Sequence, residues 1–375
     1  MGWRVPIARP DLGPAEQEAV QAAIRSGWVT QGARVRELET AFARLCDVDH
    51  AVATSTGTAA LHVALLALGI GAGDEVITTP LSCIASANPI LFAGARPVFA
   101  DVDPETYAID PADVERRITT RTRALLPVHL FGHPVDLDAL LAIARARRLV
   151  VIEDACQATG ARYKGRRVGG LADVGCFSLY ANKIVTSAEG GMLVTRDPEL
   201  AARMAAVRNF GQRPGEHFVH AFLGGNYKMS DLHAAIGCAQ LPKLDGYIER
   251  RRKNVAELNA ALRGLEAMIE RLPAERAWAR AVYFGYHMLF RTAALKRKAE
   301  AALHAAGVET RPFFSLIPAE EPYRSSGYSP ADTPVAADLV ARGLYVSNSP
   351  DLTVEDRGVI VDALRALARA EGLGG

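Results

Sequence analysis

One lysine in a stretch of small and apolar residues is the first candidate for chemistry. Lys183 lies between two short segments, Val174–Tyr180 and Met192–Thr195, that have the length and composition of buried strands. An ammonium group beside a buried strand is costly to desolvate unless it is paired or its pKa falls. An amine with a lowered pKa is a nucleophile that forms a Schiff base with an aldehyde. The alternative is a loop lysine whose ammonium group reaches solvent.

A carboxylate at the end of the preceding predicted strand gives Lys183 a partner. The apolar run Leu149–Ile152 ends in Glu153 and Asp154, and ligands of open α/β sheets bind at the carboxyl ends of strands. Pyridoxal phosphate requires a lysine for its aldehyde and an acid that keeps its ring nitrogen protonated. We interpret Lys183 and Asp154 as this catalytic pair. Taken alone, an aspartate that ends a strand is commonly a turn or cap residue.

Three segments around this pair resemble a known family. They are Glu153–Gly160 (EDACQATG), Gly175–Lys183 (GCFSLYANK) and Glu189–Met192 (EGGM). All three resemble the DegT/DnrJ/EryC1/StrS aminotransferases, and the resemblance extends from about Pro6 to about Leu367. It implies the aspartate aminotransferase-like fold of fold-type-I pyridoxal phosphate-dependent transferases, and a reaction that aminates keto sugars.

The order of the predicted elements supports an α/β fold. Strands such as Arg96–Asp103 and Ala124–Phe131 alternate with helical patterns, which predicts a mostly parallel sheet between helices. From about residue 246 the pattern changes to a smaller α+β unit. We therefore predict a large cofactor-binding domain with an N-terminal arm at 1–245, and a small C-terminal α+β domain at 246–375.

The resemblance assigns several residues to the cofactor. Gly57 lets the backbone approach a ligand closely, and the free N–H groups of Thr58 and Ala59 open a predicted helix, where phosphate groups bind readily. Ser178 is implied at the same phosphate group. Gln157 is implied beside the ring oxygen. Without the resemblance, the glycine turn is a common helix-capping loop.

Two further cofactor positions depart from the usual residues of the family. Many members stack an aromatic residue on the cofactor ring where this chain has Cys83, whose thiol can also lie against a ring. The segment Gly225–Asp231 resembles a motif that reaches the partner subunit's cofactor phosphate, so Asn226 and Lys228 imply a homodimer with shared active sites. Lysine at 228 keeps the charge of the usual arginine but loses its bidentate geometry. The alternative is a simple loop that ends at a helix cap, Ser230.

We expect four residues to contact the substrate. The resemblance places Trp28 beside the active site, although packing at the domain edge is the alternative. Tyr180 belongs to a segment that resembles the perosamine synthases of the family. Arg311 and Phe313 lie in Thr310–Phe314, which resembles a substrate-side motif.

The resemblance implies amino transfer to a nucleotide-linked keto sugar. Relatives that dehydrate their sugar have a histidine where this chain has Lys183. The expected acceptor is a 4-keto-6-deoxyhexose and the expected amino-acid donor is L-glutamate. A 3-keto sugar or a cyclitol ketone stays open as the acceptor. A pyridoxal phosphate-binding regulator without turnover is the alternative from another class.

Composition excludes several other functions. A formal net charge of +1 argues against a nucleic-acid partner and against a general attraction to anionic membranes. The five cysteines are scattered and odd in number, which indicates reduced thiols rather than a disulfide framework or a metal site. The N-terminus resembles no signal peptide and no run is long enough to span a bilayer, so we expect a cytoplasmic protein.

Overall fold

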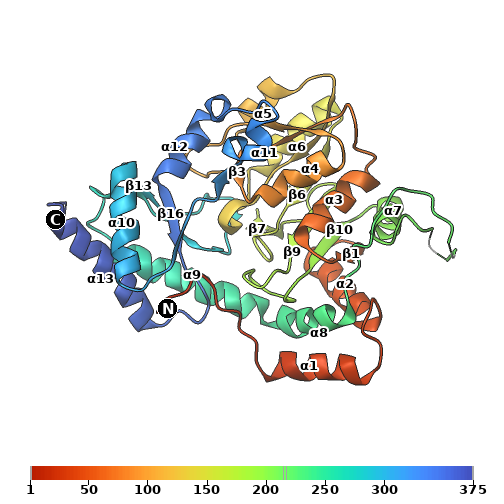
Figure 1. The fold of residues 1–375 in the computed structure, drawn as a ribbon, viewed down its shortest axis with the longest axis horizontal. Helices are drawn as coiled ribbons and strands as arrows, with labels where there is room; N and C mark the ends of the chain where they lie inside the picture. The colour runs from red at the N-terminus through yellow and green to blue at the C-terminus, as the bar shows by residue number, and fades with distance from the viewer. Residues whose placement is uncertain (1, 214, 217, 374–375) are drawn as a thin grey trace.

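The computed structural model describes residues 2–213, 215–216 and 218–373. Its centre is a seven-stranded sheet with the order β1-β10-β9-β6-β5-β2-β4 (Figure 1). β10 runs antiparallel to both β1 and β9, and the other neighbours are parallel. The expected mostly parallel sheet is confirmed. The strands are β1 (His50–Thr54), β10 (Gly191–Thr195), β9 (Val174–Ser178), β6 (Val150–Asp154), β5 (Thr122–Leu126), β2 (Glu75–Thr78) and β4 (Arg96–Phe99).

Helices cover both faces of this sheet because its strands are apolar on both sides. Phe177 of β9 packs into a core with α2 and α6, whereas its neighbour Cys176 packs into a second core with α3 and α7. Successive strand residues point to opposite faces, so one strand supplies both cores. The helices of this part are α1 (Pro14–Arg25), α2 (Ala33–Leu45), α3 (Gly57–Ala67), α4 (Asn88–Phe92), α5 (Pro111–Arg117), α6 (Leu137–Arg147), α7 (Pro198–Arg208) and α8 (Asp231–Gln240).

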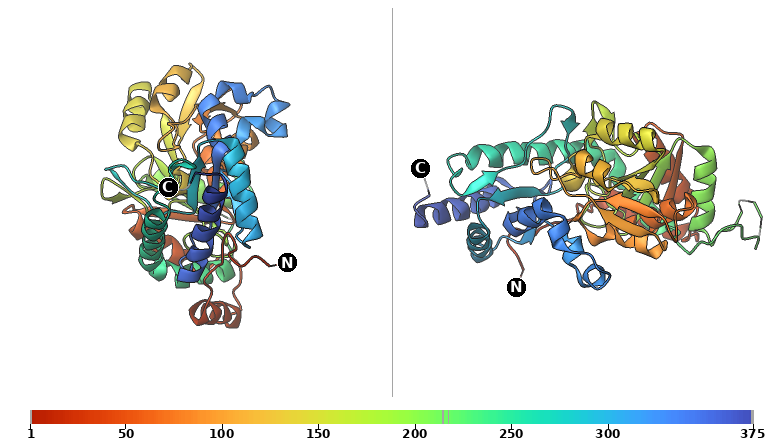
Figure 2. Two further views of the ribbon diagram at one scale, coloured as in Figure 1. Left: turned by 90° about the vertical axis from the view of Figure 1, so that its left-hand side faces the viewer. Right: turned by 90° about the horizontal axis from the view of Figure 1, so that it is seen from above.

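The C-terminal part forms a four-stranded antiparallel sheet with its own apolar core. The right-hand view of Figure 2 shows this part beside the large sheet. α9 begins at Leu244, so the proposed boundary at 245/246 falls inside its first turn. The elements are α9 (Leu244–Ala261), β11 (Ile269–Arg271), β13 (Tyr286–Phe290), α10 (Ala293–Ala305), β14 (Thr310–Pro312), α11 (Glu321–Arg324), α12 (Pro334–Arg342), β16 (Gly343–Val346) and α13 (Val354–Ala370).

A short strand precedes α4. Leu81–Ser82 forms the strand β3, and α4 begins only at Asn88. β3 pairs antiparallel with β15 (Ser315–Leu316), which lies far away in the sequence. This pairing is tertiary, so no local pattern indicates it.

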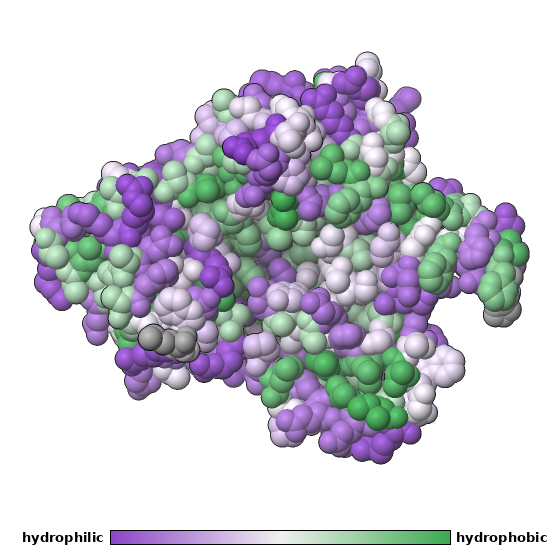
Figure 3. Space-filling model, in the orientation of Figure 1, coloured by the Kyte–Doolittle hydropathy of each residue, from purple (hydrophilic) through white to green (hydrophobic). Residues whose placement is uncertain are grey.

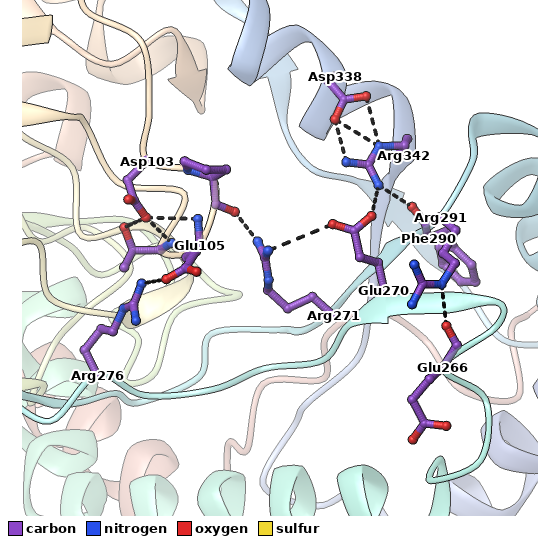
Figure 4. Close-up of polar contacts among 12 residues, drawn as sticks. Asp103, Glu105, Glu266, Glu270, Arg271, Arg276, Phe290, Arg291, Asp338 and Arg342 are labelled. Atoms are coloured by element: carbon purple, nitrogen blue, oxygen red, sulfur yellow. Dashed lines mark hydrogen bonds and ion pairs between the residues drawn. The ribbon is translucent and has the colours of Figure 1, made fainter.

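Backbone pairs and ion pairs join the two parts. β12 (Ala279–Arg280) extends a small sheet formed by β7 (Arg162–Tyr163) and β8 (Arg166–Arg167). Figure 4 shows Arg276 paired with Glu105, and Arg271 donating to the carbonyl of Pro104. Exposed ion pairs contribute little to stability, so the strand pairs and buried contacts hold the parts together.

Exposed apolar side chains gather at two places. Figure 3 shows an apolar patch over α1, and Ile24 and Trp28 are exposed there. The second place is the long loop 209–225, which projects from the body at the right of Figure 1. Phe218 and Leu223 of this loop are 90% and 85% exposed. Among the residues that the structure describes, no helix is both long and apolar enough to cross a membrane.

Candidate active site

A cavity of about 230 Å³ lies where β6 and β9 end. Asp154 is the last residue of β6, and Lys183 lies in the loop that follows β9. Both residues line this cavity, so the structure brings the predicted pair together. The lining consists of Thr56, Gly57, Thr58, Leu61, Cys83, Ala85, Ser86, Asp154, Cys156, Gln157, Ser178, Tyr180, Lys183 and Glu189.

Asp154 is buried and fixed by two hydrogen bonds. The hydroxyl of Ser86 donates to its Oδ2 at 2.7 Å, and the backbone N–H of Cys156 donates to its Oδ1 at 3.0 Å. The hydroxyl of Ser82 lies 2.9 Å from that of Ser86. Burial and the charge of Asp154 both raise the pKa of the Cys156 thiol well above its usual value. The cavity therefore holds one oriented carboxylate beside a protonated thiol.

Lys183 is held by the backbone of its loop rather than by an acid. Its N–H donates to the carbonyl of Tyr180 at 2.9 Å. Its Nζ lies 4.9 Å from the ring centroid of Phe284, within the range of a cation–π contact. Within the described residues it forms no ion pair with a carboxylate. Its amine is therefore not committed to an acid inside the chain.

The start of α3 forms one wall of the cavity. A β-carbon on Gly57 would lie 2.8 Å from Cβ of Ser178, so this position requires glycine for close packing rather than for a special φ. The N–H groups of Gly57 and Thr58 donate to no described acceptor, as is usual in a first helical turn. The N–H of Ala59 donates to Oγ1 of Thr56 at 3.0 Å. The expectation of a free N–H at Ala59 is therefore wrong, because the Thr56 cap occupies it.

Gln157 and Cys83 complete the inner lining. Oε1 of Gln157 accepts the backbone N–H of Phe131 at 2.9 Å, which fixes the orientation of the amide and leaves its NH₂ group as a donor. Cys83 is exposed and lines the same cavity. Its thiol is thus available for contact with a bound ring.

These residues fit pyridoxal phosphate. The cavity combines an amine, an oriented carboxylate, and a helix start beside the hydroxyl of Ser178, which match the aldehyde, the ring nitrogen and the phosphate of that cofactor. The close approach of Gly57 to Ser178 brings the phosphate-binding groups together.

Comparison with known proteins decides the family. Residues 10–365 match the DegT/DnrJ/EryC1/StrS aminotransferase family. The chain belongs to this family. It is therefore a pyridoxal phosphate-dependent aminotransferase, and the fold-type-I expectation is confirmed.

This aminotransferase matches individual relatives over nearly its whole length. It is 38% identical over 364 residues to a GDP-perosamine synthase of Caulobacter vibrioides, with 96% of this chain and 97% of the relative covered. It is 35% identical over 360 residues to a pleiotropic regulatory protein of Geobacillus stearothermophilus, with 96% and 95% covered. Among solved structures, DesV of S. venezuelae in complex with a ketimine intermediate has a TM-score of 0.90, with 35% identity and 94% of each chain covered.

The residues that the sequence predicts to contact the substrate are not all in one place. Tyr180 lines the cofactor cavity and is half-exposed. Arg311 lies on β14 outside that lining and pairs with Glu309 at 2.7 Å. Trp28 is 59% exposed in a separate surface cleft beside α1, where its Nε1 donates to the carbonyl of Gln31. Substrate contacts of Arg311 and Trp28 stay predictions.

The expectation that Phe313 contacts the substrate is corrected by the structure. Its side chain is fully buried in an aromatic cluster with Tyr107, Phe131 and His287. The backbone takes a positive φ at the next residue, Phe314. The side chain of Phe313 therefore faces away from the solvent and stabilises the core.

Asn226 and Lys228 lie outside the cavity of their own chain. Nζ of Lys228 donates to Oδ1 of Asn209 at 2.9 Å and lies 4.4 Å from the ring centroid of Phe210. Burial, with the nearby charge of Arg208, lowers the pKa of Lys228. Asn226 forms an isolated backbone bridge with Asn209. Their expected role at the cofactor of a partner stays a prediction.

Sequence reasoning missed six residues of the lining. Two of them, Leu61 and Ala85, are apolar, and the other four are Thr56, Ser86, Cys156 and Glu189. Thr56 carried a usable signal, because a threonine before a helical run is a common cap. Ser86 carried none, because its contact with Asp154 depends on the tertiary fold.

Proposed function

We propose that this aminotransferase transfers an amino group from L-glutamate to a nucleotide-linked 4-keto-6-deoxyhexose. The observation that carries the proposal is the single cavity shared by Lys183, Asp154 and the start of α3. The similarity to a GDP-perosamine synthase supports a nucleotide-linked sugar as the acceptor.

The residues have distinct roles in this proposal. When bound, pyridoxal phosphate supplies an electron sink for the carbanion character that develops during amino transfer. Asp154 holds the proton on the ring nitrogen, and the Ser86 hydroxyl keeps that carboxylate in position. Ser178 and the first N–H groups of α3 bind the phosphate. Nζ of Lys183 would hold the cofactor through its aldehyde, and as a free amine it would act as a general base.

The proposal includes a homodimer. Asn226 and Lys228 do not line the cavity of their own chain, so a contact with the phosphate requires a second copy. The exposed apolar side chains of loop 209–225 support this arrangement, because Phe218 and Leu223 are exposed there and the exposed ring of Phe210 contacts Lys228.

Spectroscopy tests the proposal directly. The visible absorption of the purified protein is recorded with pyridoxal phosphate, then after L-glutamate, and then after a GDP-linked 4-keto-6-deoxyhexose. We expect glutamate to bleach the visible band, and the keto sugar to restore it with release of the amino sugar. Lys183→Ala should lower turnover by about 10²–10⁴-fold or more. A band that glutamate leaves unchanged would point to another donor.

The second candidate function is a regulator that binds the cofactor without turnover. The similarity to a pleiotropic regulatory protein favours it. The same titration separates the two candidates, because a regulator retains its visible band after glutamate alone and releases no amino sugar when the keto sugar follows. A 3-keto sugar or a cyclitol ketone is tested as acceptor in parallel, with the position of the new amine read from the product.

A further inference from the structure

A second cavity of about 30 Å³ adjoins Lys183. The N-terminal arm Ile7–Asp11, the loop that holds Lys183, α9 and the segment after β16 line it, together with Gln240, Phe284 and Tyr345. Lys183 is the one described residue that lines both cavities. A cavity needs roughly 10–15 Å³ to hold one water, so this space is large enough for a group of two polar atoms and too small for a sugar or a diphosphate.

The guanidinium of Arg251 lies at this cavity without a carboxylate partner in the described chain. The residue is only 5% exposed. Its Nη1 donates to the carbonyls of Phe284 and Asn348 at 3.1 and 2.8 Å, and its buried Nε has no partner among the described residues. Burial lowers the pKa of Arg251 to about 10, so the group is still protonated near neutral pH. A buried charge without a counter-ion is costly, so an anion in this cavity would offset that cost.

The other polar groups of the cavity suit the two ends of an amino acid. Oδ1 of Asn182, the neighbour of Lys183, is buried and accepts no hydrogen bond from the described residues. Asp11 brings a negative charge to the lining, but it accepts the hydroxyl of Tyr247 at 2.8 Å and lies toward solvent. Arg9 brings a further positive charge and pairs with Asp351 at 3.6 Å. Positive groups therefore outnumber negative ones, and a free acceptor lies beside the reactive amine.

We propose that this cavity seats a carboxylate of the amino-acid donor and that Arg251 binds it. The inference rests on the proposed function in one respect, namely that the anion belongs to the amino donor. The donor must bring its nitrogen to the carbon that Lys183 holds, and Lys183 lies between the two cavities and lines both. The carboxylate then enters the smaller cavity while the cofactor occupies the larger one. An ion pair with a guanidinium is among the strong charge-assisted contacts.

The test measures binding of an unreactive anion to the cofactor-loaded enzyme by calorimetry. Glutarate carries carboxylates but no amine or ketone, and glutaramide is its neutral analogue. We expect glutarate to bind and glutaramide not to bind. Pyrophosphate serves as the third probe, because the sugar nucleotide is the other source of anionic groups. Binding of pyrophosphate in place of glutarate would overturn the proposal.

Two variants and two controls locate the site. Arg251→Met should weaken glutarate binding about tenfold or more, the loss expected for one hydrogen bond to a charged group. Asn182→Asp keeps the shape of its side chain and should weaken glutarate by charge repulsion, which keeps the test decisive if Arg251→Met fails to fold. Arg263→Met and Gln17→Glu make matched changes at exposed positions and should leave binding unchanged.

The outcomes separate this proposal from the proposed function. If glutamate bleaches the visible band while glutarate binds equally to the wild type and both variants, the aminotransferase function stands and the role of Arg251 is refuted. If glutarate binding is lost in both variants but no keto sugar is aminated, the carboxylate site stands and the proposed acceptor is wrong.

Discussion

At the scale of single residues, Ser86 tests how the acid of the site is positioned. Its hydroxyl is the side-chain donor to Oδ2 of Asp154, at 2.7 Å in a buried setting. Ser86→Ala should weaken binding of pyridoxal phosphate about tenfold, because a buried carboxylate loses one charge-assisted hydrogen bond. Equilibrium dialysis of the cofactor measures the change, with the exposed Ser325→Ala as control. Unchanged affinity in Ser86→Ala would show that Ser82 replaces the lost donor.

His287 makes stability depend on pH. The ring is 6% exposed and stacks on Phe131 at 4.5 Å, and burial lowers the pKa of His287 from 6.5 to about 3. Below pH 6.5 the unfolded chain binds a proton that the folded chain excludes. The free energy of unfolding therefore falls by about 1.4 kcal/mol per pH unit as pH drops from 6.5 toward 3.

Urea unfolding of the wild type and of His287→Phe isolates this effect. Between pH about 7 and about 5.5, the wild type should lose roughly 1.4 kcal/mol more than the variant, because only the wild type carries the suppressed protonation. Other titrating groups are common to both proteins and cancel in the difference. Equal losses in the two proteins would contradict the assignment.

Some residue roles were predictable and others were not. Lys183 and Asp154 were recognisable as a pair, because a lysine beside a buried strand and an acid at the end of the preceding strand together match the needs of pyridoxal phosphate. Phe313 and Ala59 were misjudged for a different reason. The orientation of a side chain in a short strand and the partner of one N–H group depend on the tertiary structure and on a neighbouring cap.

At the scale of elements, the contact between α3 and β9 shapes the phosphate site. A β-carbon at Gly57 would meet Cβ of Ser178 at 2.8 Å and Sγ of Cys156 at 3.2 Å. Gly57→Ala should therefore push the helix start away from the strand and destabilise the protein by about 1–3 kcal/mol. Cofactor affinity should fall with it. Thermal unfolding and cofactor titration measure both effects.

A second glycine provides the matched control. Gly246 lies in the first turn of α9, and a β-carbon there meets nothing within 4 Å. Gly246→Ala should stabilise the protein by about 0.5–1 kcal/mol, because alanine loses less backbone entropy in a helix. Similar effects at the two positions would show that helix propensity, rather than the contact with Ser178, governs residue 57.

Most elements of the large sheet were predictable, because their signals are local. Proline and acidic residues mark the start of α1, a short β-branched run marks β6, and a short run with valine and phenylalanine marks β9. The strand β3 was not predictable, since it exists only through its partner Ser315–Leu316. The antiparallel direction of β10 is likewise a property of its neighbours.

At the scale of the whole molecule, the described part of loop 209–225 has features that the proposed homodimer requires. The loop leaves the body of the chain in Figure 1 and carries Phe218 and Leu223 almost fully exposed. It also supplies Asn209 and Phe210, which hold Lys228. Lys228 follows this loop and is held by its first two residues, which suits it to contact another subunit in the proposed dimer.

Substitutions that remove the exposed apolar side chains of this loop should therefore both dissociate the proposed dimer and reduce activity. Phe218→Ser combined with Leu223→Glu should raise the dimer dissociation constant by about 30-fold or more, as expected when large interface side chains are lost. Analytical ultracentrifugation measures the constant, and activity should fall on dilution because Asn226 and Lys228 would no longer reach a partner's cofactor. Val354→Ser removes an apolar side chain that is exposed elsewhere and should change neither property. A dissociated variant with full activity would refute the shared site, since each chain would then bind its phosphate alone.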